Sequence, residues 1–247
     1  MPRQPLQPLI PGETDPNMPV GQDAPHFRCT WRFENALRRQ GFASVAGCDE
    51  AGRGALLGPL YAAAVILDPA RPIRGLDDSK KLTPAEREEL DSVIREKALA
   101  FAVVAVSAGD VDALNVYQAS RRAMILALEV LRPAPHFVIT DAMRLAGWGD
   151  PCEFLLPYRS IVHGDARSVS IAAASILAKV ARDARLVELD RLYPQYQLAS
   201  NKGYGTPEHL EGLARHGPCP EHRRTFQPVR GYDLPLFSDW PPPSDPV

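Results

Sequence analysis

Four carboxylates in the chain stand where apolar segments end. Asp49 and Glu50 are adjacent and follow one apolar run, Asp141 follows another, and Asp165 lies just before a long Ala-rich segment. Gathered carboxylates repel one another unless a cation lies among them, and hard cations such as Mg²⁺ or Mn²⁺ prefer oxygen ligands. The four acids therefore predict a two-metal site that clamps both oxygens of an in-line phosphoryl displacement. The chemistry expected of such a site is phosphodiester hydrolysis.

Each acid has a simpler explanation when it is taken alone. An Asp-Glu pair in a loop is usually a solvated surface feature. Asp165 precedes a predicted helix, where an aspartate often caps the first turn and gains from the helix dipole. The metal-site hypothesis therefore depends on all four acids lying together.

Three short motifs could contact a nucleic acid. The glycines of Gly52-Arg53-Gly54 would let backbone N–H groups approach a phosphate or a sugar hydroxyl. Lys80 could hold a phosphate, and the glycine-flanked Tyr204 could stack on a base or a sugar. Solvated turns, or for Tyr204 a ring packed on the surface, remain the ordinary alternatives.

Positive charge gathers near the C-terminal end of the predicted domain, where we expect contacts with a phosphate backbone. The residues concerned are His216, His222, Arg223, Arg224 and Arg230. The histidines of this region lack a tight metal-ligand spacing, so they are predicted to be structural or to face phosphate rather than to bind zinc. They are His209, His216 and His222.

The elements that must position these residues follow from short apolar runs and from helical periodicity. Strands are predicted over residues 43–48, 59–67, 100–106 and 136–140. Helices are predicted over 83–97, 117–131 and 169–192, the first of them from the capping pattern of Thr83, Pro84 and Glu86. This alternation predicts an α/β fold, a sheet covered by helices.

Composition limits the classes of protein and of partner. Lys and Arg number 28 and Asp and Glu 30, so the net charge of −2 gives no global attraction to nucleic acid or membrane. The longest uncharged run, 54–67, falls short of the roughly 20 residues that span a bilayer, and no apolar signal core is seen. We expect no membrane partner and a cytoplasmic location. The four cysteines form no C-x-x-C pair, which favours free thiols.

Proline-rich ends define the expected domain organisation. Residues 1–27 and 233–247 are interpreted as tails, and residues 28–232 as one catalytic domain with a helical C-terminal part. No heptad seam is seen, so a monomer is expected.

The motifs taken together resemble bacterial ribonuclease HII, the type 2 ribonuclease H family, over about residues 45–229. The resemblance is carried by residues 47–54 with 58–59, 78–82, 164–165, 170–183, 202–206 with 209, and 222–226. It implies a ribonuclease-H-like mixed β-sheet flanked by helices, with a small helical C-terminal extension. By the resemblance, Asp49, Glu50, Asp141 and Asp165 bind Mg²⁺ or Mn²⁺, activate a water and stabilise the leaving 3′ oxygen.

The resemblance also implies a substrate. Such enzymes cleave RNA within RNA–DNA hybrids and cut duplex DNA 5′ to a single embedded ribonucleotide, leaving a 3′-OH and a 5′-phosphate. The backbone of Gly52-Arg53-Gly54 would sense the 2′-hydroxyl, Tyr204 would pack on the adjoining deoxyribose, and Lys80 would contact a phosphate.

Two departures from the family pattern and one tail motif add expectations. Ala142 stands after Asp141 where the family usually has glycine, and the segment that follows is longer than usual, so a different loop path is expected. His163 replaces a common lysine. In the C-terminal tail, Asp233, Leu234, Leu236 and Phe237 resemble a sliding-clamp-binding peptide, although packing onto the protein's own domain is the simpler interpretation.

Other classes of protein remain as alternatives. A catalytically silent protein that binds hybrid or DNA on the same fold would have lost a carboxylate, whereas all four are present. Another nuclease or recombinase on the same sheet is disfavoured by the Gly52-Arg53-Gly54 and Tyr204 motifs. The related ribonuclease HIII carries an extra N-terminal domain, which the short Pro-rich segment before Asp49 does not match.

Overall fold

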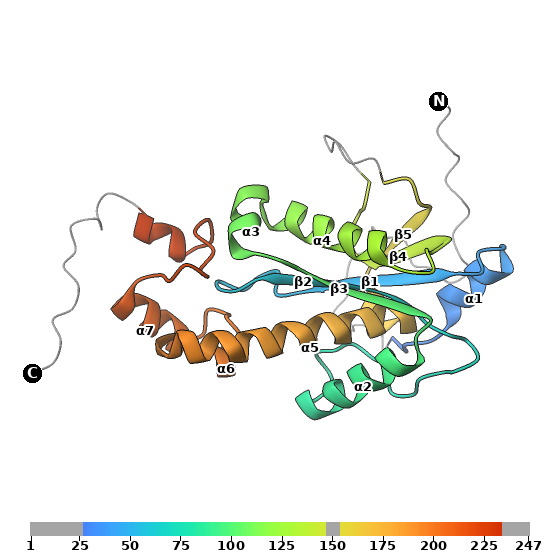
Figure 1. Ribbon diagram of the computed structural model, residues 1–247, viewed down its shortest axis with the longest axis horizontal. Coiled ribbons are helices and arrows are strands. Elements are labelled where there is room, and N and C mark those ends of the chain that lie inside the picture. Colours follow the sequence, from blue (N-terminus) through green and yellow to red (C-terminus); the bar gives the residue numbers. More distant parts are fainter. Residues whose placement is uncertain (1–26, 147–153, 234–247) are drawn as a thin grey trace, which may run out of the picture.

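The computed structural model describes residues 27–146 and 154–233, which fold around one five-stranded mixed sheet (Figure 1). The strands are β1 Val45–Ala51, β2 Leu60–Ile66, β3 Ala100–Val106, β4 Phe137–Asp141 and β5 Tyr158–Ile161. Their order across the sheet is β3-β2-β1-β4-β5. The hairpin strands β1, β2 and β3 are antiparallel, whereas β4 runs parallel to both β1 and β5. The central strand β1 therefore has an antiparallel neighbour on one side and a parallel neighbour on the other.

Helices cover both faces of the sheet. They are α1 Arg32–Arg39, α2 Pro84–Lys97, α3 Ala108–Leu114, α4 Val116–Val130, α5 Val169–Leu192, α6 Leu198–Asn201 and α7 Pro207–His216. Figure 1 shows α3 and α4 on one face and α2 and α5 on the other, with α6 and α7 gathered at one end of α5. Short 3₁₀ turns lie at Gly164–Ala166, Pro194–Tyr196 and Val229–Asp233. The predicted α/β class is confirmed.

The close approach of α5 to the central strand depends on small residues. The first half of α5 buries a run of alanines against β1 and β2. On β1, a Cβ atom at Gly47 would lie 2.2 Å from the backbone carbon of Ser170. Because that contact is backbone and cannot move aside, any larger residue at Gly47 would push the helix away from the sheet.

The start of α2 follows the predicted capping pattern. The side chain of Thr83 accepts a hydrogen bond from the Glu86 N–H at 3.3 Å, and the Glu86 carboxylate accepts one from the Thr83 N–H at 2.7 Å. Both exchanged bonds satisfy N–H groups that the helix itself leaves free, so the capping box is confirmed.

Most predicted boundaries agree with the structure, and two differences concern the acids. β3 and α5 have the predicted bounds, and β2 and α4 lie within a residue of them. However, β1 continues to Ala51, so Asp49 and Glu50 belong to the strand and not to the turn after it; likewise Asp141 is the last residue of β4. The short elements α1, α3 and β5 were not predicted. Among the described residues, no helix is long and apolar enough to cross a membrane.

Candidate active site

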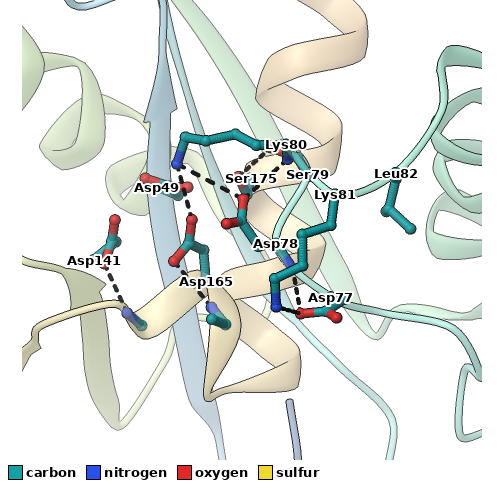
Figure 2. A network of polar contacts seen from close by, with 12 residues as sticks. Asp49, Asp77, Asp78, Ser79, Lys80, Lys81, Leu82, Asp141, Asp165 and Ser175 are labelled. Carbon is teal, nitrogen blue, oxygen red and sulfur yellow. Dashed lines mark hydrogen bonds and ion pairs between the residues drawn. The ribbon is translucent and has the colours of Figure 1, made fainter. Parts of the chain in front are cut away.

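Three of the four acids meet at one edge of the sheet. Cys48 on β1 is aligned with Thr140 on the parallel strand β4, so the next residues, Asp49 and Asp141, lie side by side. Asp165 reaches the same place from the 3₁₀ turn before α5. One carboxylate oxygen from each of these three residues lies within 4.8 Å of the others (Figure 2).

Backbone N–H groups hold these carboxylates in place. Asp49 Oδ1 and Asp165 Oδ1 each accept a hydrogen bond from the N–H of the following residue, at 2.7 and 2.9 Å. Asp141 Oδ1 accepts one from the Gly164 N–H at 2.7 Å, which ties β4 to the turn that carries Asp165. One oxygen of each group is thereby oriented by the chain.

The capping explanation for Asp165 is wrong, because Ser168 caps α5 instead. The Ser168 hydroxyl accepts a hydrogen bond from the Ile171 N–H at 3.3 Å. Asp165 is left with its carboxylate in the acidic group, 4% exposed.

Glu50 lies beside the group of three aspartates and not within it. Neighbouring residues of a strand point to opposite faces of the sheet, and Asp49 lies on the α5 face. Glu50 therefore points to the α4 face, where its Oε1 lies 3.5 Å from Nη1 of Arg53. Its Oε2 is buried and has no hydrogen-bond partner. The predicted set of four is thus arranged as a group of three aspartates with one glutamate beside it.

Burial and mutual repulsion raise the pKa values of Asp49, Glu50 and Asp141 and so favour their protonated forms. Burial raises the pKa of Glu50 to about 7, against the opposing charge of Arg53. Burial and the charge of Asp165 raise the pKa of Asp141 to about 6. Burial and the charges of Glu50 and Asp141 raise the pKa of Asp49 well above its usual range. A cation among these groups would remove the repulsion and favour ionisation.

The donor set fits a hard divalent cation. The side chains supply only carboxylate oxygens, and Glu50 brings a buried oxygen that lacks a partner. Asp49, Asp141 and Asp165 would hold the ion. No second cluster of three His, Cys, Asp or Glu side chains comes as close together in residues 27–146 and 154–233.

Lys80, predicted to contact a phosphate, lies over the acidic group. Its Nζ is 3.2 Å from Asp165 Oδ2 and 3.7 Å from Asp78 Oδ1 (Figure 2). Burial lowers the pKa of Lys80, but the charges of Asp165 and Asp78 outweigh that effect and hold the pKa above its usual value. The side chain is therefore an ammonium.

The two predicted substrate loops meet at Arg182. Gly52 has a φ of +88°, and a Cβ there would lie 1.9 Å from the Arg182 Nε, so only glycine fits. The guanidinium carbon of Arg182 also lies 5.4 Å from the ring centre of Tyr204, which is 39% exposed. Gly52 and Tyr204, far apart in sequence, thus both lie against the Arg182 side chain.

Sequence reasoning missed the two buried arginines that fix these loops. Arg182 donates to the carbonyl of Lys202 at 2.9 Å. Arg223 donates to the carbonyl of Arg53 at 2.9 Å and twice to that of Gly58, at 3.2 and 3.0 Å. Arg223 was expected to face nucleic acid, and that expectation is wrong because its side chain is fully buried. The helical spacing of Arg182 with the buried Ala178, Leu186 and Leu189 could have revealed it.

Two of the three histidines of the same region, His209 and His222, have a structural role. His209 and His222 are buried and lie 3.1 Å apart, Nε2 to Nε2. The Nδ1 of His209 lies 2.9 Å from the carbonyl oxygen of Tyr204 and so anchors the loop that carries this ring. His216 is exposed at the end of α7.

The residue after Asp141 keeps an unusual backbone conformation. Ala142 has a φ of +46°, and its N–H donates to the carbonyl of Ile161 at 3.0 Å. That conformation favours glycine, which accounts for the glycine that the resemblance leads one to expect here. The longer following segment includes residues 147–153, which lie outside the described residues.

Comparison with known proteins decides the family. A model of the family described as Ribonuclease HII matches residues 46–229. The chain belongs to the ribonuclease HII family. Ribonuclease HII of Solibacter usitatus (strain Ellin6076) is 51% identical over 214 residues, which cover 86% of this chain and 91% of that protein.

Two solved structures support the fold. The crystal structure of ribonuclease H2 from Pyrococcus horikoshii OT3 is 28% identical and has a TM-score of 0.64, over 76% of this chain and 96% of that one. Ribonuclease HII of Archaeoglobus fulgidus, solved in a complex with PCNA, is 26% identical with a TM-score of 0.60, over 74% and 95% of the two chains.

The expected fold and enzyme class are therefore confirmed. The mixed sheet with flanking helices is ribonuclease-H-like, and the helical C-terminal part is present as α6 and α7. The protein is an endoribonuclease of the family that acts on RNA–DNA hybrids, and its acidic cluster can bind a divalent metal.

Proposed function

We propose that the protein degrades the RNA of RNA–DNA hybrids and also cuts duplex DNA on the 5′ side of a single embedded ribonucleotide, leaving a 3′-OH and a 5′-phosphate. The observation that carries the proposal is the convergence of Asp49, Asp141 and Asp165 within 4.8 Å in a chain of the ribonuclease HII family. Its place in the cell would be the cytoplasm, where these substrates arise in bacteria.

The acids would hold the metal ions. Asp49, Asp141 and Asp165 form one group, and Glu50, next to Asp49 on β1 and with a buried oxygen that has no partner, would supply the fourth carboxylate. Mg²⁺ or Mn²⁺ bound there would activate a water and offset the charge on the leaving 3′ oxygen. The backbone N–H groups that orient the aspartates keep their oxygens in place before substrate arrives.

The loops beside the acids would select the ribonucleotide. The Gly52-Arg53-Gly54 backbone would contact the 2′-hydroxyl, which distinguishes RNA from DNA. Nothing lies within 4 Å of the position a Cβ would take at Gly54, so a sugar can approach the main chain there. Tyr204 has an exposed ring next to Arg182 and would pack on the adjoining deoxyribose, and Lys80 would meet a phosphate.

The test uses an end-labelled DNA duplex with one ribonucleotide, beside an all-DNA duplex and a long RNA–DNA hybrid. We expect a cut 5′ to the ribonucleotide with Mg²⁺ or Mn²⁺, no cut with chelator, and no cut of the all-DNA duplex. Cutting of the long hybrid alone would disprove the 2′-hydroxyl role of the loops while keeping the metal site. No cutting of either substrate would instead favour a protein that binds hybrid without cleaving it.

A partner is proposed for the C-terminal segment. Asp233 ends the described residues, and Leu234, Leu236 and Phe237 lie outside them. The Archaeoglobus fulgidus relative was solved in complex with PCNA, which supports a clamp partner for this chain, and the sequence of the segment is the reason to place the contact there. Replacing Leu236 and Phe237 together with alanine should abolish binding to the bacterial sliding clamp in fluorescence anisotropy and leave cleavage of a short duplex unchanged.

A further inference from the structure

Lys80 lies beside the carboxylates that would hold a metal ion, and so next to where the substrate phosphate would be cleaved. Its ammonium is 3.2 Å from Asp165 Oδ2, an oxygen of the acidic group, and Asp49 lies close enough to act on its charge. The neighbouring Lys81 pairs instead with Asp77 at 3.0 Å. Two adjacent lysines therefore have different partners, and only one of them faces the acidic group (Figure 2).

The backbone around Lys80 is held by hydrogen bonds, whereas most of its side chain is exposed to solvent. The Ser79 hydroxyl lies 2.9 Å from that of Ser175 on α5, and the Ser79 carbonyl accepts a hydrogen bond from Arg87 at 2.9 Å. The Lys80 N–H donates to Asp78 at 2.9 Å. Yet the Lys80 side chain is 78% exposed, so its four-carbon stem can turn while its base stays fixed.

We propose that Lys80 is an internal cation of the acidic group, which a divalent ion displaces from Asp165 so that the ammonium turns toward the substrate phosphate. This inference rests on the proposed metal site. An ammonium on Asp165 and a divalent ion held by the same carboxylate compete, because each neutralises the negative charge that attracts the other. The displaced ammonium stays within a side chain's length of the site, since the loop at Ser79 remains tied to α5.

The exchange has two consequences. Before metal binds, Lys80 offsets part of the repulsion among the aspartates, so it stabilises the metal-free protein and weakens metal binding. After metal binds, the ammonium is free to pair with a phosphate and strengthens substrate binding. Solvent screens the ammonium of an exposed side chain, so we expect an effect of about tenfold on metal affinity.

The test measures Mn²⁺ binding to the protein without nucleic acid, by electron paramagnetic resonance of the free ion. Lys80→Met and Lys80→Gln keep the length of the side chain and remove its charge, and Lys81→Met is the matched control. We expect both Lys80 variants to bind Mn²⁺ about tenfold more tightly and Lys81→Met to bind it like the unaltered protein. In steady-state cleavage, the Lys80 variants should show a raised KM for the hybrid.

The outcomes separate this inference from the proposed function. Equal or weaker Mn²⁺ binding by both Lys80 variants, with the unaltered protein binding normally, would overturn the role of Lys80 as an internal cation. Absence of Mn²⁺ binding by the unaltered protein would overturn the metal site itself. Melting curves give a second measurement: the Lys80 variants should melt lower than the unaltered protein in chelator and match it in saturating Mn²⁺.

Discussion

The acidic group and the pair Arg182 and Arg223 both bury charge, and they do so in opposite ways. The arginines are fully buried, and no carboxylate lies within ion-pair distance of either among the described residues. Asp49 and Asp165 are almost as buried and Asp141 is half-buried, but the three lie against one another. One region surrounds its buried positive charges with carbonyl oxygens, and the other places carboxylates next to one another.

Hydrogen bonding explains why the arginine region is stable as it stands. Arg182 donates to the carbonyls of Leu57, Pro59 and Lys202, and Arg223 donates to those of Arg53 and Gly58. Burial lowers the pKa of Arg223 to about 10, so it remains charged at neutral pH. The planar guanidinium spreads its charge over several donors, which suits a ring of carbonyl oxygens.

The acidic group has no comparable set of donors. Lys80 and Arg53 are the cations nearby, each reaching one of the acids, and one oxygen of Glu50 is buried without a partner. A region with satisfied groups forms a rigid frame, whereas a region with unmet charge has affinity for an added cation. We infer that the first region positions the substrate loops and the second performs the chemistry.

The largest expected effect comes from neutralising one acid. Asp49→Asn keeps the shape of the side chain and removes its charge, so it should lower kcat by at least about a thousandfold, which corresponds to about 4 kcal/mol. The melting temperature of the metal-free variant should not fall, because a repulsive charge has been removed. Cleavage of the single-ribonucleotide duplex and a melting curve measure the two properties. A variant that kept full activity would show that Asp49 is not a ligand.

For the arginine frame, the residues Arg182 and Arg223 with the carbonyls they bind, we expect a loss of stability. Arg223→Met leaves the carbonyls of Arg53 and Gly58 buried without a donor, so it should reduce the free energy of unfolding by about 3 kcal/mol. Urea denaturation measures the loss, and the exposed Arg230→Met is the matched control, with a change within about 0.5 kcal/mol. A similar small change in both variants would mean that the frame contributes no stability.

The pH dependence of stability should differ with and without metal. The folded-state pKa values of Glu50, about 7, and Asp141, about 6, exceed their ordinary values of 4.5 and 3.8. The folded protein therefore binds more protons than the unfolded chain between about pH 4 and 7. The metal-free protein should lose several kcal/mol as the pH rises through that range, because each unit of pKa difference corresponds to about 1.4 kcal/mol. Saturating Mg²⁺ should restore this loss at pH 8 and add little at pH 5.

Asp49→Asn is the control for that measurement. Removing one charge from the group should reduce both the loss of stability as the pH rises and the stabilisation by Mg²⁺. Thermal melting at pH 5 and pH 8, with and without Mg²⁺, measures both. Equal Mg²⁺ stabilisation of the variant and the unaltered protein at pH 8 would place the bound ion elsewhere.

Periodicity and end signals predicted the elements that have a strong local cause. The buried alanines of α5 and the capping box of α2 gave correct bounds because each is written in neighbouring residues. The three-residue extension of β1 was missed because Asp49 and Glu50 look like turn residues. Their strand conformation comes from pairing with β2, which is a tertiary effect.

The chemistry of the site was easier to predict than its geometry. Four acids at element ends suggested a metal site. The separation of Glu50 from Asp49 follows from the alternation of side chains along β1, and it could be predicted only if the strand was known to continue past residue 48. Arg223 was assigned to nucleic acid because charge normally avoids burial. The carbonyl oxygens that satisfy it come from residues 165 or more positions earlier in the chain, so no local pattern could reveal them.

The smallest expected effect concerns Tyr204, whose ring is proposed to contact the substrate that the acidic group cleaves. Tyr204 packs its ring by Arg182, and the proposed stacking needs that ring and not the hydroxyl. Tyr204→Phe should therefore cost less than 0.5 kcal/mol in substrate binding, whereas Tyr204→Ala should cost about 1–2 kcal/mol, seen as a raised KM on the single-ribonucleotide duplex. Metal affinity should be unchanged in both variants, because Tyr204 belongs to the frame and not to the acidic group. Equal losses for phenylalanine and alanine would show that the hydroxyl, and not the ring, contacts the substrate.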